Sequence, residues 1–393
     1  MATTSKSPLR VVRAALATAR RALPAYRHRC SPKVYTQHQL FACLVLKNFL
    51  KTDYRGVTAH LADHADLCKT LGLKKVPHFT TLQKASQRLL LAARAKKLLD
   101  ATVRLHLGRK RRVRSAAIDS TGLECTSASA YFVKRRAHVS APWKTMVYHR
   151  FPKLGVVCDT SDHFILAMAA GHGPRPDVDE FRPLIGDATR RVRLSCLAAD
   201  AGYDSEPNHR FARDEHGVRT VIPAKHGRPT SKPASGRYRR LMQVRFDRAT
   251  YRRRSQVETV MSMLKRRQGS HVRGRSYWSR CRDLTLMVLT HNVILLVFLR
   301  VFYRASHGPS TPIGRALRSP LAAGWRRSWT YRSSMRPRTL CRSPSRIARL
   351  WTGCGSGPTA DACRRILQAC FVPDAPAVRR RSVPSPRRTK LPN

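Results

Sequence analysis

Apolar residues recur at helical spacing through the region that follows the first thirty or so residues. Thr36 with Gln39 three residues later is a capping-box pattern, which predicts the start of a helix. Thr80 with Gln83 repeats the pattern and predicts the N-terminal end of a long helical segment. We therefore expect a small all-helical domain over residues 34–110.

The pattern changes after this region, where short apolar runs bounded by turn residues alternate with helical segments near 179–190 and 206–215. Runs of this length and composition are typical of strands. Strands that alternate with helices predict an α/β layer built on a central sheet. The predicted strands are Val113–Ile118, Lys153–Cys158, Phe164–Ala169, Leu194–Ala199 and Thr220–Pro223.

Residues 224–243 are rich in Lys, Arg, Gly, Pro and Ser and predict a basic loop that faces DNA. Helices are expected at 251–267 and 278–303. The second contains the longest apolar run, Leu284–Leu299, which polar residues interrupt near its middle. The run is shorter than the roughly 20 residues needed to cross a bilayer, so we predict a buried core helix and no membrane partner.

Both ends of the chain are basic. Residues 1–33 have the composition of a flexible DNA-contacting arm, which an organellar transit peptide shares. Residues 306–393 are rich in Arg, Pro and Ser, lack any structural period and predict disorder. An out-of-frame or read-through extension would have the same appearance.

The overall charge identifies the class of partner. The 393 residues include 77 Lys and Arg against 22 Asp and Glu, a formal net charge of +55. A compact body with that excess repels itself unless it meets a polyanion, so a nucleic acid is the expected partner. The 11 cysteines form no CxxC pair and no zinc-finger spacing, which favours reduced thiols in the cytosol.

Acidic residues are scarce, and two of them follow predicted strands. Asp119 comes directly after Ala116–Ile118, and Asp200 directly after Cys196–Ala199. If the two strands are adjacent and parallel, their carboxylates meet at one edge of the sheet. In the alternative interpretation, each aspartate simply begins a turn.

A third carboxylate lies within a dense run of arginine and lysine. Tyr251, Arg254, Glu258 and Lys265 fall within roughly a 60° arc of an ideal helix and would share one face. Such a face presents a carboxylate between cations, as a metal ligand beside a DNA backbone would be. The alternative is a surface helix with an ordinary Arg–Glu ion pair.

The helical domain also has two interpretations. Lys84, Gln87 and Arg88 would face a DNA groove if the domain is a helix-turn-helix. The same residues form a solvated basic face if the domain is a plain helical cap.

Three sequence blocks resemble those of bacterial insertion-sequence DDE transposases, in the branch with a Tyr-Arg-Glu-Lys signature. They are Ala-Ile-Asp-Ser-Thr around Asp119, DxGYD from Asp200 to Asp204, and YxxRxxxExxxxxxK from Tyr251 to Lys265. The last block matches at every defined position. The resemblance covers roughly residues 35–305.

This resemblance implies an RNase H-like catalytic domain over residues 111–305 with a mixed five-stranded sheet. It implies Asp119 on the first strand, Asp200 just after the fourth and Glu258 on a helix packed on the sheet, together holding two Mg²⁺ or Mn²⁺ ions. Tyr251, Arg254 and Lys265, with Arg252 and Arg253, would bind DNA. Asp204 is expected to stabilise its turn rather than to bind metal.

The implied protein is a homodimeric transposase of the bacterial cytoplasm, associated with the nucleoid. It would bind terminal inverted repeats, cleave the ends and join 3′-hydroxyls to target DNA. The alternatives are a metal-dependent nuclease or junction resolvase on the same fold, an inactive or domesticated transposase that binds DNA, and a structural nucleic-acid-binding protein.

Overall fold

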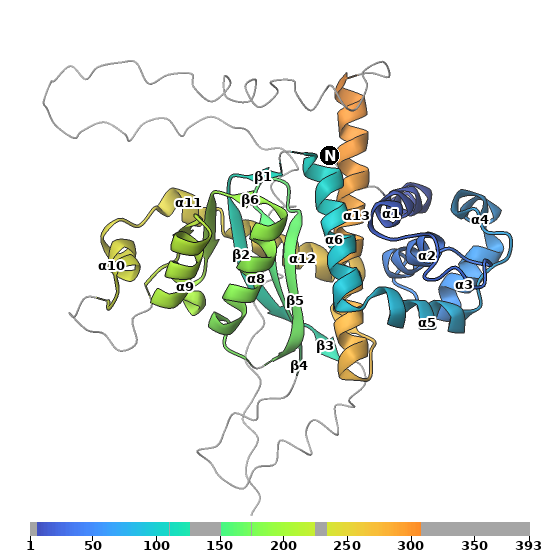
Figure 1. Ribbon diagram of the computed structural model, residues 1–393, viewed down its shortest axis with the longest axis horizontal. Coiled ribbons are helices and arrows are strands. Elements are labelled where there is room, and N and C mark those ends of the chain that lie inside the picture. Colours follow the sequence, from blue (N-terminus) through green and yellow to red (C-terminus); the bar gives the residue numbers. More distant parts are fainter. Residues whose placement is uncertain (1–5, 110, 126–150, 174, 225–233, 308–393) are drawn as a thin grey trace, which may run out of the picture. The chain divides into compact units, whose positions relative to one another are not determined.

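The computed structural model describes residues 6–109, 111–125, 151–173, 175–224 and 234–307. Its centre is a mixed five-stranded sheet in the order β5-β4-β2-β7-β8, flanked by helices (Figure 1). The predicted α/β class and the number of strands are confirmed. The strands are β2 (Ala116–Gly122), β4 (Phe151–Asp159), β5 (Ile165–Gly173), β7 (Cys196–Ala199) and β8 (Arg219–Val221).

Strand β2 lies in the middle of the sheet and fixes its topology. It pairs antiparallel with β4 and parallel with β7, while β4 pairs antiparallel with β5 and β7 parallel with β8. The predicted parallel neighbours are therefore present. Strand β2 continues through Asp119 to Gly122, so the expectation that the strand ends at Asp119 was wrong. Pairing with β4 extends it, because Asp119 lies opposite Val156.

The two faces of the sheet belong to two separate hydrophobic clusters, since neighbouring residues in a strand point to opposite faces. Ala117 and Val156 belong to the cluster of helices α12 (Ser255–Gln268) and α13 (Tyr277–His307). Ile118 and Val157 belong to the cluster of helix α8 (Val178–Arg191). Adjacent residues of β2 consequently face different surroundings.

Six helices precede the sheet: α1 (Pro8–Ala22), α2 (Gln37–Phe49), α3 (Tyr54–Asp63), α4 (Ala65–Leu71), α5 (Phe79–Leu89) and α6 (Ala92–Leu107). The capping box of Thr36 and Gln39 is present at the start of α2. The second predicted box is absent, because α5 begins after His78 and Thr80 bonds the His78 ring. The long segment is also divided into α5 and α6 at Leu90 and Leu91.

The prediction of a flexible arm over residues 1–33 was wrong for residues 8–22, which form helix α1. Ser7 and Pro8 begin α1, and Val11, Val12, Ala15 and Ala19 are fully buried. The arginines of α1 occupy the opposite side of the helix, and their number concealed an amphipathic pattern in the sequence. The predicted tail, beyond the end of α13, lies outside the described residues.

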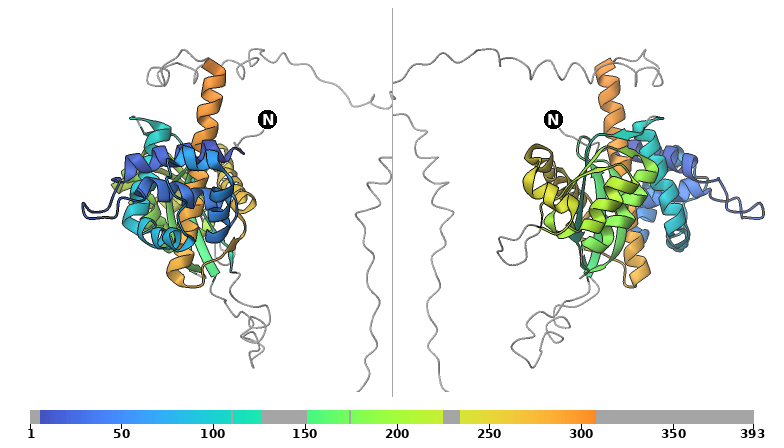
Figure 2. Two further views of the ribbon diagram at one scale, coloured as in Figure 1. Left: turned by 90° about the vertical axis from the view of Figure 1, so that its right-hand side faces the viewer. Right: turned by 60° about the vertical axis from the view of Figure 1, so that its left-hand side comes forward.

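Helix α13 joins the helical region to the sheet. It lies between β5 on one side and α1 and α2 on the other (Figures 1 and 2), and one hydrophobic cluster includes residues of all four. Its segment Tyr277–Phe298 is long and apolar enough to cross a membrane, but 78% of an apolar 18-residue stretch within it is buried inside the protein. The predicted core helix is thus confirmed.

The remaining elements are short. Two strand pairs, β1 (Arg112–Val113) with β6 (Arg193–Leu194) and β3 (Glu124–Cys125) with β9 (His271–Val272), lie outside the main sheet. The segment after β7 forms the 3-10 turn η1 (Ala201–Tyr203), helix α9 (Glu206–Arg210) and the π-helical turn η2 (Phe211–Glu215). Helices α10 (Arg237–Val244) and α11 (Arg248–Arg252) precede α12.

The loop predicted for residues 224–243 was wrong from residue 237 onward, where helix α10 begins. Residues 225–233 lie outside the described part. The helix is short and mostly polar, and only Tyr238 and Met242 are buried. That apolar pair was too small to predict a helix.

Asn292 explains the polar interruption of the apolar helix. Its side chain accepts from Ile165 N at 3.0 Å, and it donates to Ile165 O at 2.8 Å and to Thr102 Oγ1 at 3.1 Å. Ile165 lies on the edge strand β5, where backbone groups without a strand partner need another one.

We expect Asn292→Leu to lower the free energy of unfolding by about 2–4 kcal/mol, because it leaves two buried backbone groups unpaired. Thr290→Val is the matched control, since Thr290 is fully buried and its hydroxyl has no hydrogen-bond partner among the described residues. Denaturant titration of the full chain measures both. Equal effects of the two substitutions would contradict the bridging role of Asn292.

Candidate active site

Asp119 and Asp200 are neighbours because of the pairing between β2 and β7. Ile118 lies opposite Ala199 in a parallel register, and each is followed by an aspartate. The predicted meeting of these two residues at one edge of the sheet is therefore present. Asp119 is about a quarter exposed, and its Oδ1 accepts from Ser120 N at 2.8 Å.

The surroundings of Asp119 disfavour an unpaired negative charge. Partial burial raises the pKa of its carboxyl, and the charges of Asp177 and Asp200 raise it further. The Ser120 N–H and the Arg254 guanidinium oppose this shift of the pKa. Pairing of the Asp119 carboxylate with a proton or a cation is consequently favoured at this site.

Glu258 lies in the first turn of α12, and Arg254 links it to the first aspartate. Arg254 Nη2 is 2.6 Å from Glu258 Oε1, and Arg254 Nη1 is 3.7 Å from Asp119 Oδ2. Helix α12 contacts β2 and β4, and Val257 and Val260 are fully buried on that side. One guanidinium thus lies between the two carboxylates.

The predicted continuous helix from Tyr251 to Lys265 was wrong in part. Helix α11 ends at Arg252, a turn follows, and α12 begins at Ser255. The Tyr251 hydroxyl nevertheless lies 3.5 Å from Asp200 Oδ1. Arg252 and Arg253 are exposed, and Lys265 is partly buried farther along α12.

Three segments far apart in the chain therefore contribute to one candidate site. Residues 114–293, which include Asp119, Asp200 and Glu258, match the family model described as the transposase DDE domain. This match covers a little less than half of the chain.

Other comparisons add less. No curated protein matches the chain. A pre-cleavage Mos1 transpososome is similar at 13% identity over 74% of this chain and 84% of the other, with a TM-score of 0.18. The Mos1 strand transfer complex is similar at 12% identity over 68% and 82%, with a TM-score of 0.17. Likeness at these scores supports no structural argument.

The carboxylates of the candidate site supply the hard oxygen ligands that divalent cations prefer. Within the described residues, however, no three His, Cys, Asp or Glu side chains already form a closed metal-binding group. The Arg254 guanidinium lies between Asp119 and Glu258 and contacts both carboxylates. The donor chemistry fits Mg²⁺ or Mn²⁺ provided that Arg254 moves away from Asp119.

Asp204, the second aspartate of the DxGYD block, is turned away from these carboxylates. It is fully buried, and its Oδ2 is 2.8 Å from Arg239 Nη2 of α10, while its Oδ1 is 3.4 Å from His209 Nε2. The side chain binds neighbouring helices rather than only its own turn. Asp204 therefore anchors α10 beside the sheet.

Three further residues at this edge were not predicted as site residues: Ser120, Lys153 and Asp177. Ser120 Oγ donates to Asp177 Oδ1 at 2.7 Å, and Lys153 Nζ is also 2.7 Å from that oxygen. A lysine within an apolar strand was the available signal, because a buried ammonium requires an acidic partner.

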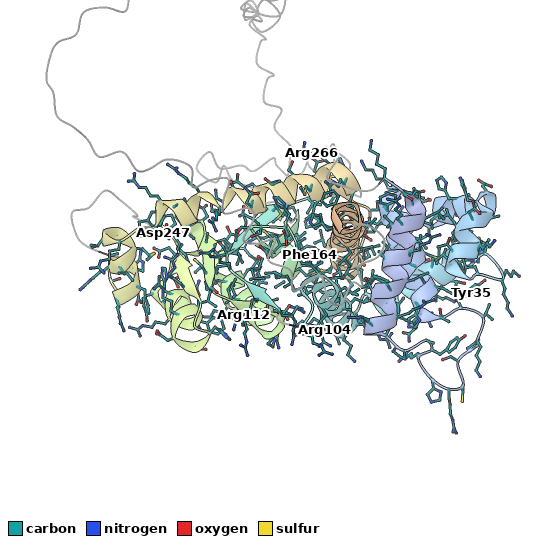
Figure 3. All side chains as sticks on the ribbon, turned by 90° about the horizontal axis from the view of Figure 1, so that it is seen from above. Tyr35, Arg104, Arg112, Phe164, Asp247 and Arg266 are labelled. Carbon is teal, nitrogen blue, oxygen red and sulfur yellow. The ribbon has the colours of Figure 1, made fainter. Side chains whose placement is uncertain are left out.

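Exposed arginines form a surface that we call the basic ridge. It extends over α10, α11 and the turn before α12 and leads to the candidate site. In Figure 3, Asp247 and Arg266 mark this side of the molecule, opposite Arg104 and Arg112. The basic ridge consists of Arg237, Arg240, Arg245, Arg248, Arg252 and Arg253.

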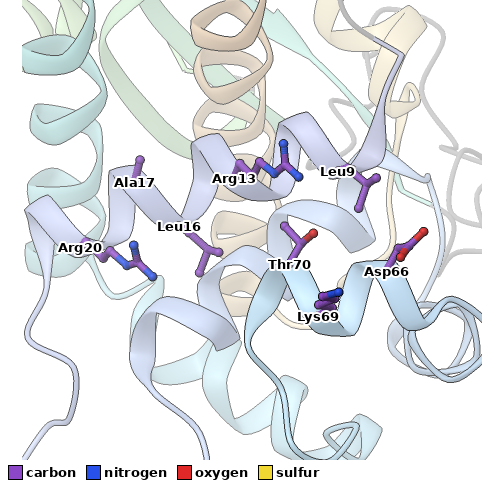
Figure 4. A pocket seen from close by; sticks show the side chains of 8 residues that line it. All are labelled: Leu9, Arg13, Leu16, Ala17, Arg20, Asp66, Lys69 and Thr70. Carbon is purple, nitrogen blue, oxygen red and sulfur yellow. The ribbon is translucent and has the colours of Figure 1, made fainter.

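A second basic surface lies on the helical region. A groove of roughly 680 Å³ between α1 and α4 is lined by Arg13, Arg20 and Lys69, with Asp66 as its one acid (Figure 4). The apolar side of α1 is buried, so its arginines necessarily face solvent. Lys84, Gln87 and Arg88 of α5 are exposed on the same region, and no contact decides between their two interpretations.

We expect Asp204→Ala to lower the free energy of unfolding by about 3 kcal/mol, because it leaves the partly buried Arg239 without its carboxylate. Glu215→Ala, at an exposed acid in the same region, should change it by less than about 0.5 kcal/mol. Thermal and denaturant unfolding give both values. A neutral Asp204→Ala would show that the ion pair does not anchor α10.

Proposed function

We propose that the chain is a DNA transposase that cleaves the ends of an insertion sequence and joins their 3′-hydroxyls to target DNA. The observation that supports this most strongly is the parallel register that places Asp119 beside Asp200, with Arg254 linking Asp119 to Glu258. The five-stranded mixed sheet is consistent with an RNase H-like catalytic domain. The match to the transposase DDE domain supports the same reaction class.

Asp119, Asp200 and Glu258 would hold two Mg²⁺ or Mn²⁺ ions. When bound, such ions would activate a water or a 3′-hydroxyl for in-line attack and stabilise the departing 3′-oxygen. Asp119 would bind metal together with Asp200 and Glu258, because the strand register puts it beside Asp200 and Arg254 links it to Glu258. Its partial burial disfavours the charged carboxylate unless a proton or a cation pairs with it.

Tyr251 and Arg254 would hold the DNA backbone at the cleavage site. The guanidinium of Arg254 offers paired N–H donors that match two phosphate oxygens. The Tyr251 hydroxyl, close to Asp200, can donate to a third oxygen. Lys265, farther along α12, would bind a phosphate outside the reacting group.

The basic ridge and the groove between α1 and α4 would bind duplex DNA. Their charges have the sign that a phosphate backbone requires, and the chain's net charge of +55 supports a nucleic-acid partner. We assign the terminal inverted repeats and the target DNA as ligands and a homodimer as the DNA-bound form. The bacterial cytoplasm, at the nucleoid, is the corresponding location.

Asp119→Ala, Asp200→Ala and Glu258→Ala should each bind DNA but lose both nicking and strand joining by at least a hundredfold. Each substitution removes a ligand of the reacting centre. The substrate is a supercoiled plasmid carrying the gene with its native flanking DNA, incubated with Mg²⁺. Glu215→Ala is the control and should retain activity.

Two outcomes of this assay would contradict the proposal. Full cleavage by any one of the three variants removes that residue from the site. Cleavage by the unsubstituted protein without joining of 3′-hydroxyl ends identifies a nuclease instead of a transposase.

DNA affinity should fall steeply with salt, and the basic ridge should carry part of that dependence. Replacing Arg240, Arg245 and Arg248 with Gln should reduce the log–log slope by about 2–3, at roughly 0.9 for each phosphate contact. Replacing the exposed Arg104, Arg112 and Arg193 should leave the slope unchanged, because Arg104 and Arg112 lie on the opposite side of the molecule and Arg193 is the strand partner of Arg112. Fluorescence anisotropy with a labelled duplex measures the slope. Equal slopes for the two triple variants would exclude the basic ridge as a DNA-binding surface.

A further inference from the structure

A second group of charges lies behind Asp119, on the other face of the sheet. Asp119 and Ser120 are adjacent in β2 and therefore point to opposite faces. Asp119 faces α12, whereas Ser120 faces α8 and bonds Asp177, the residue just before that helix. The backbone of one residue thus separates the candidate active site from this group.

Lys153 holds the group together. Its side chain is only 6% exposed, and its ammonium contacts Asp177 Oδ1 at 2.7 Å, Glu180 Oε1 at 3.2 Å and Arg175 O at 2.8 Å. A buried ammonium is stable only when oxygen atoms surround it in this way. Lys153 therefore fixes the segment before α8 against strand β4.

A glycine makes the arrangement possible. Gly155 of β4 lies opposite Ser120 of β2, and a Cβ at Gly155 would lie 2.6 Å from Glu180 Oε2. Any larger residue there would displace the Glu180 carboxylate from its place over the strand. The room left by Gly155 allows Glu180 and Asp177 to approach the same lysine.

Asp177 also lies near the segment that follows Asp200. Its Oδ2 is 3.5 Å from the place where a Cβ of Gly202 would be. Gly202 belongs to the turn that follows Asp200. Asp177 thus contacts β2 through Ser120 and lies beside the Asp200 turn.

We propose that Asp177 is a positioning residue of the divalent-cation centre, held by Lys153 and acting on Asp119 through the hydroxyl of Ser120. The proposal rests on the assignment of Asp119 and Asp200 as metal ligands. The Ser120 N–H donates to Asp119 Oδ1 at 2.8 Å, so a fixed Ser120 fixes the Asp119 carboxylate. Residues that orient a metal ligand in this way commonly alter metal affinity by 10-fold to 100-fold.

The test is a Mn²⁺ titration of the full chain without DNA, followed by the electron paramagnetic resonance signal of free Mn²⁺. Asp177→Asn should weaken Mn²⁺ binding by about 10-fold or more. Asp179→Asn is the matched control, because Asp179 is an exposed acid two residues away and makes no ion pair within the described residues. It should change the affinity by less than about twofold, since long-range effects of exposed charges are screened.

Ser120 provides a second and independent variant. Ser120→Ala removes the link but keeps every charge, and it should weaken Mn²⁺ binding by a similar factor. Ser120→Thr keeps the hydroxyl and should restore most of the affinity. If Asp177→Asn does not fold, as judged by circular dichroism, the Ser120 pair decides the question.

The outcomes separate this proposal from the proposed function. If Asp119→Asn abolishes Mn²⁺ binding while Asp177→Asn equals Asp179→Asn, the positioning role is overturned and the metal centre stands. Unchanged affinity in Ser120→Ala also overturns it. If Asp119→Asn leaves Mn²⁺ binding intact, the assigned metal centre itself fails.

Discussion

The parallel pairing of β2 with β7 is the constraint on which the candidate active site depends. Ile118 opposite Ala199 places an aspartate at the next position of each of the two neighbouring chain segments, although the two aspartates are 81 positions apart in the chain. A register shift of one residue would turn one of these side chains to the other face of the sheet. The buried valines of α12 then bring Glu258 to the same edge, so ordinary hydrophobic packing assembles the polar site.

Electrostatics gives this edge its character. The chain has few acids, yet Asp119, Asp177, Glu180, Asp200 and Glu258 gather around one end of β2. Two internal cations accompany them, Arg254 on the α12 face and Lys153 on the α8 face. The two cations have different surroundings. Arg254 is partly exposed, and a metal ion or a phosphate would compete with it for its contacts. Lys153 is buried, and three oxygen atoms hold its ammonium in place.

The elements that local sequence determines were predictable. Apolar runs located the strands, the Thr36 capping box located α2, and aspartates after apolar runs identified two site residues. Interactions between distant segments were not predictable. The burial of α1 depends on packing against α2 and α13, the length of β2 depends on β4, and the break before Ser255 interrupts a pattern that fits a continuous helix. Asp177 and Lys153 could be identified as site residues only from the fold, which places them behind Ser120.

Anomalous diffraction from crystals of the protein grown with Mn²⁺ tests the central claim most directly, because it locates the metal itself. The account predicts density for Mn²⁺ within ligand distance of Asp119 and Asp200, with Glu258 completing the centre and Arg254 displaced from Asp119. Mn²⁺ bound elsewhere, with Arg254 still between Asp119 and Glu258, would contradict it.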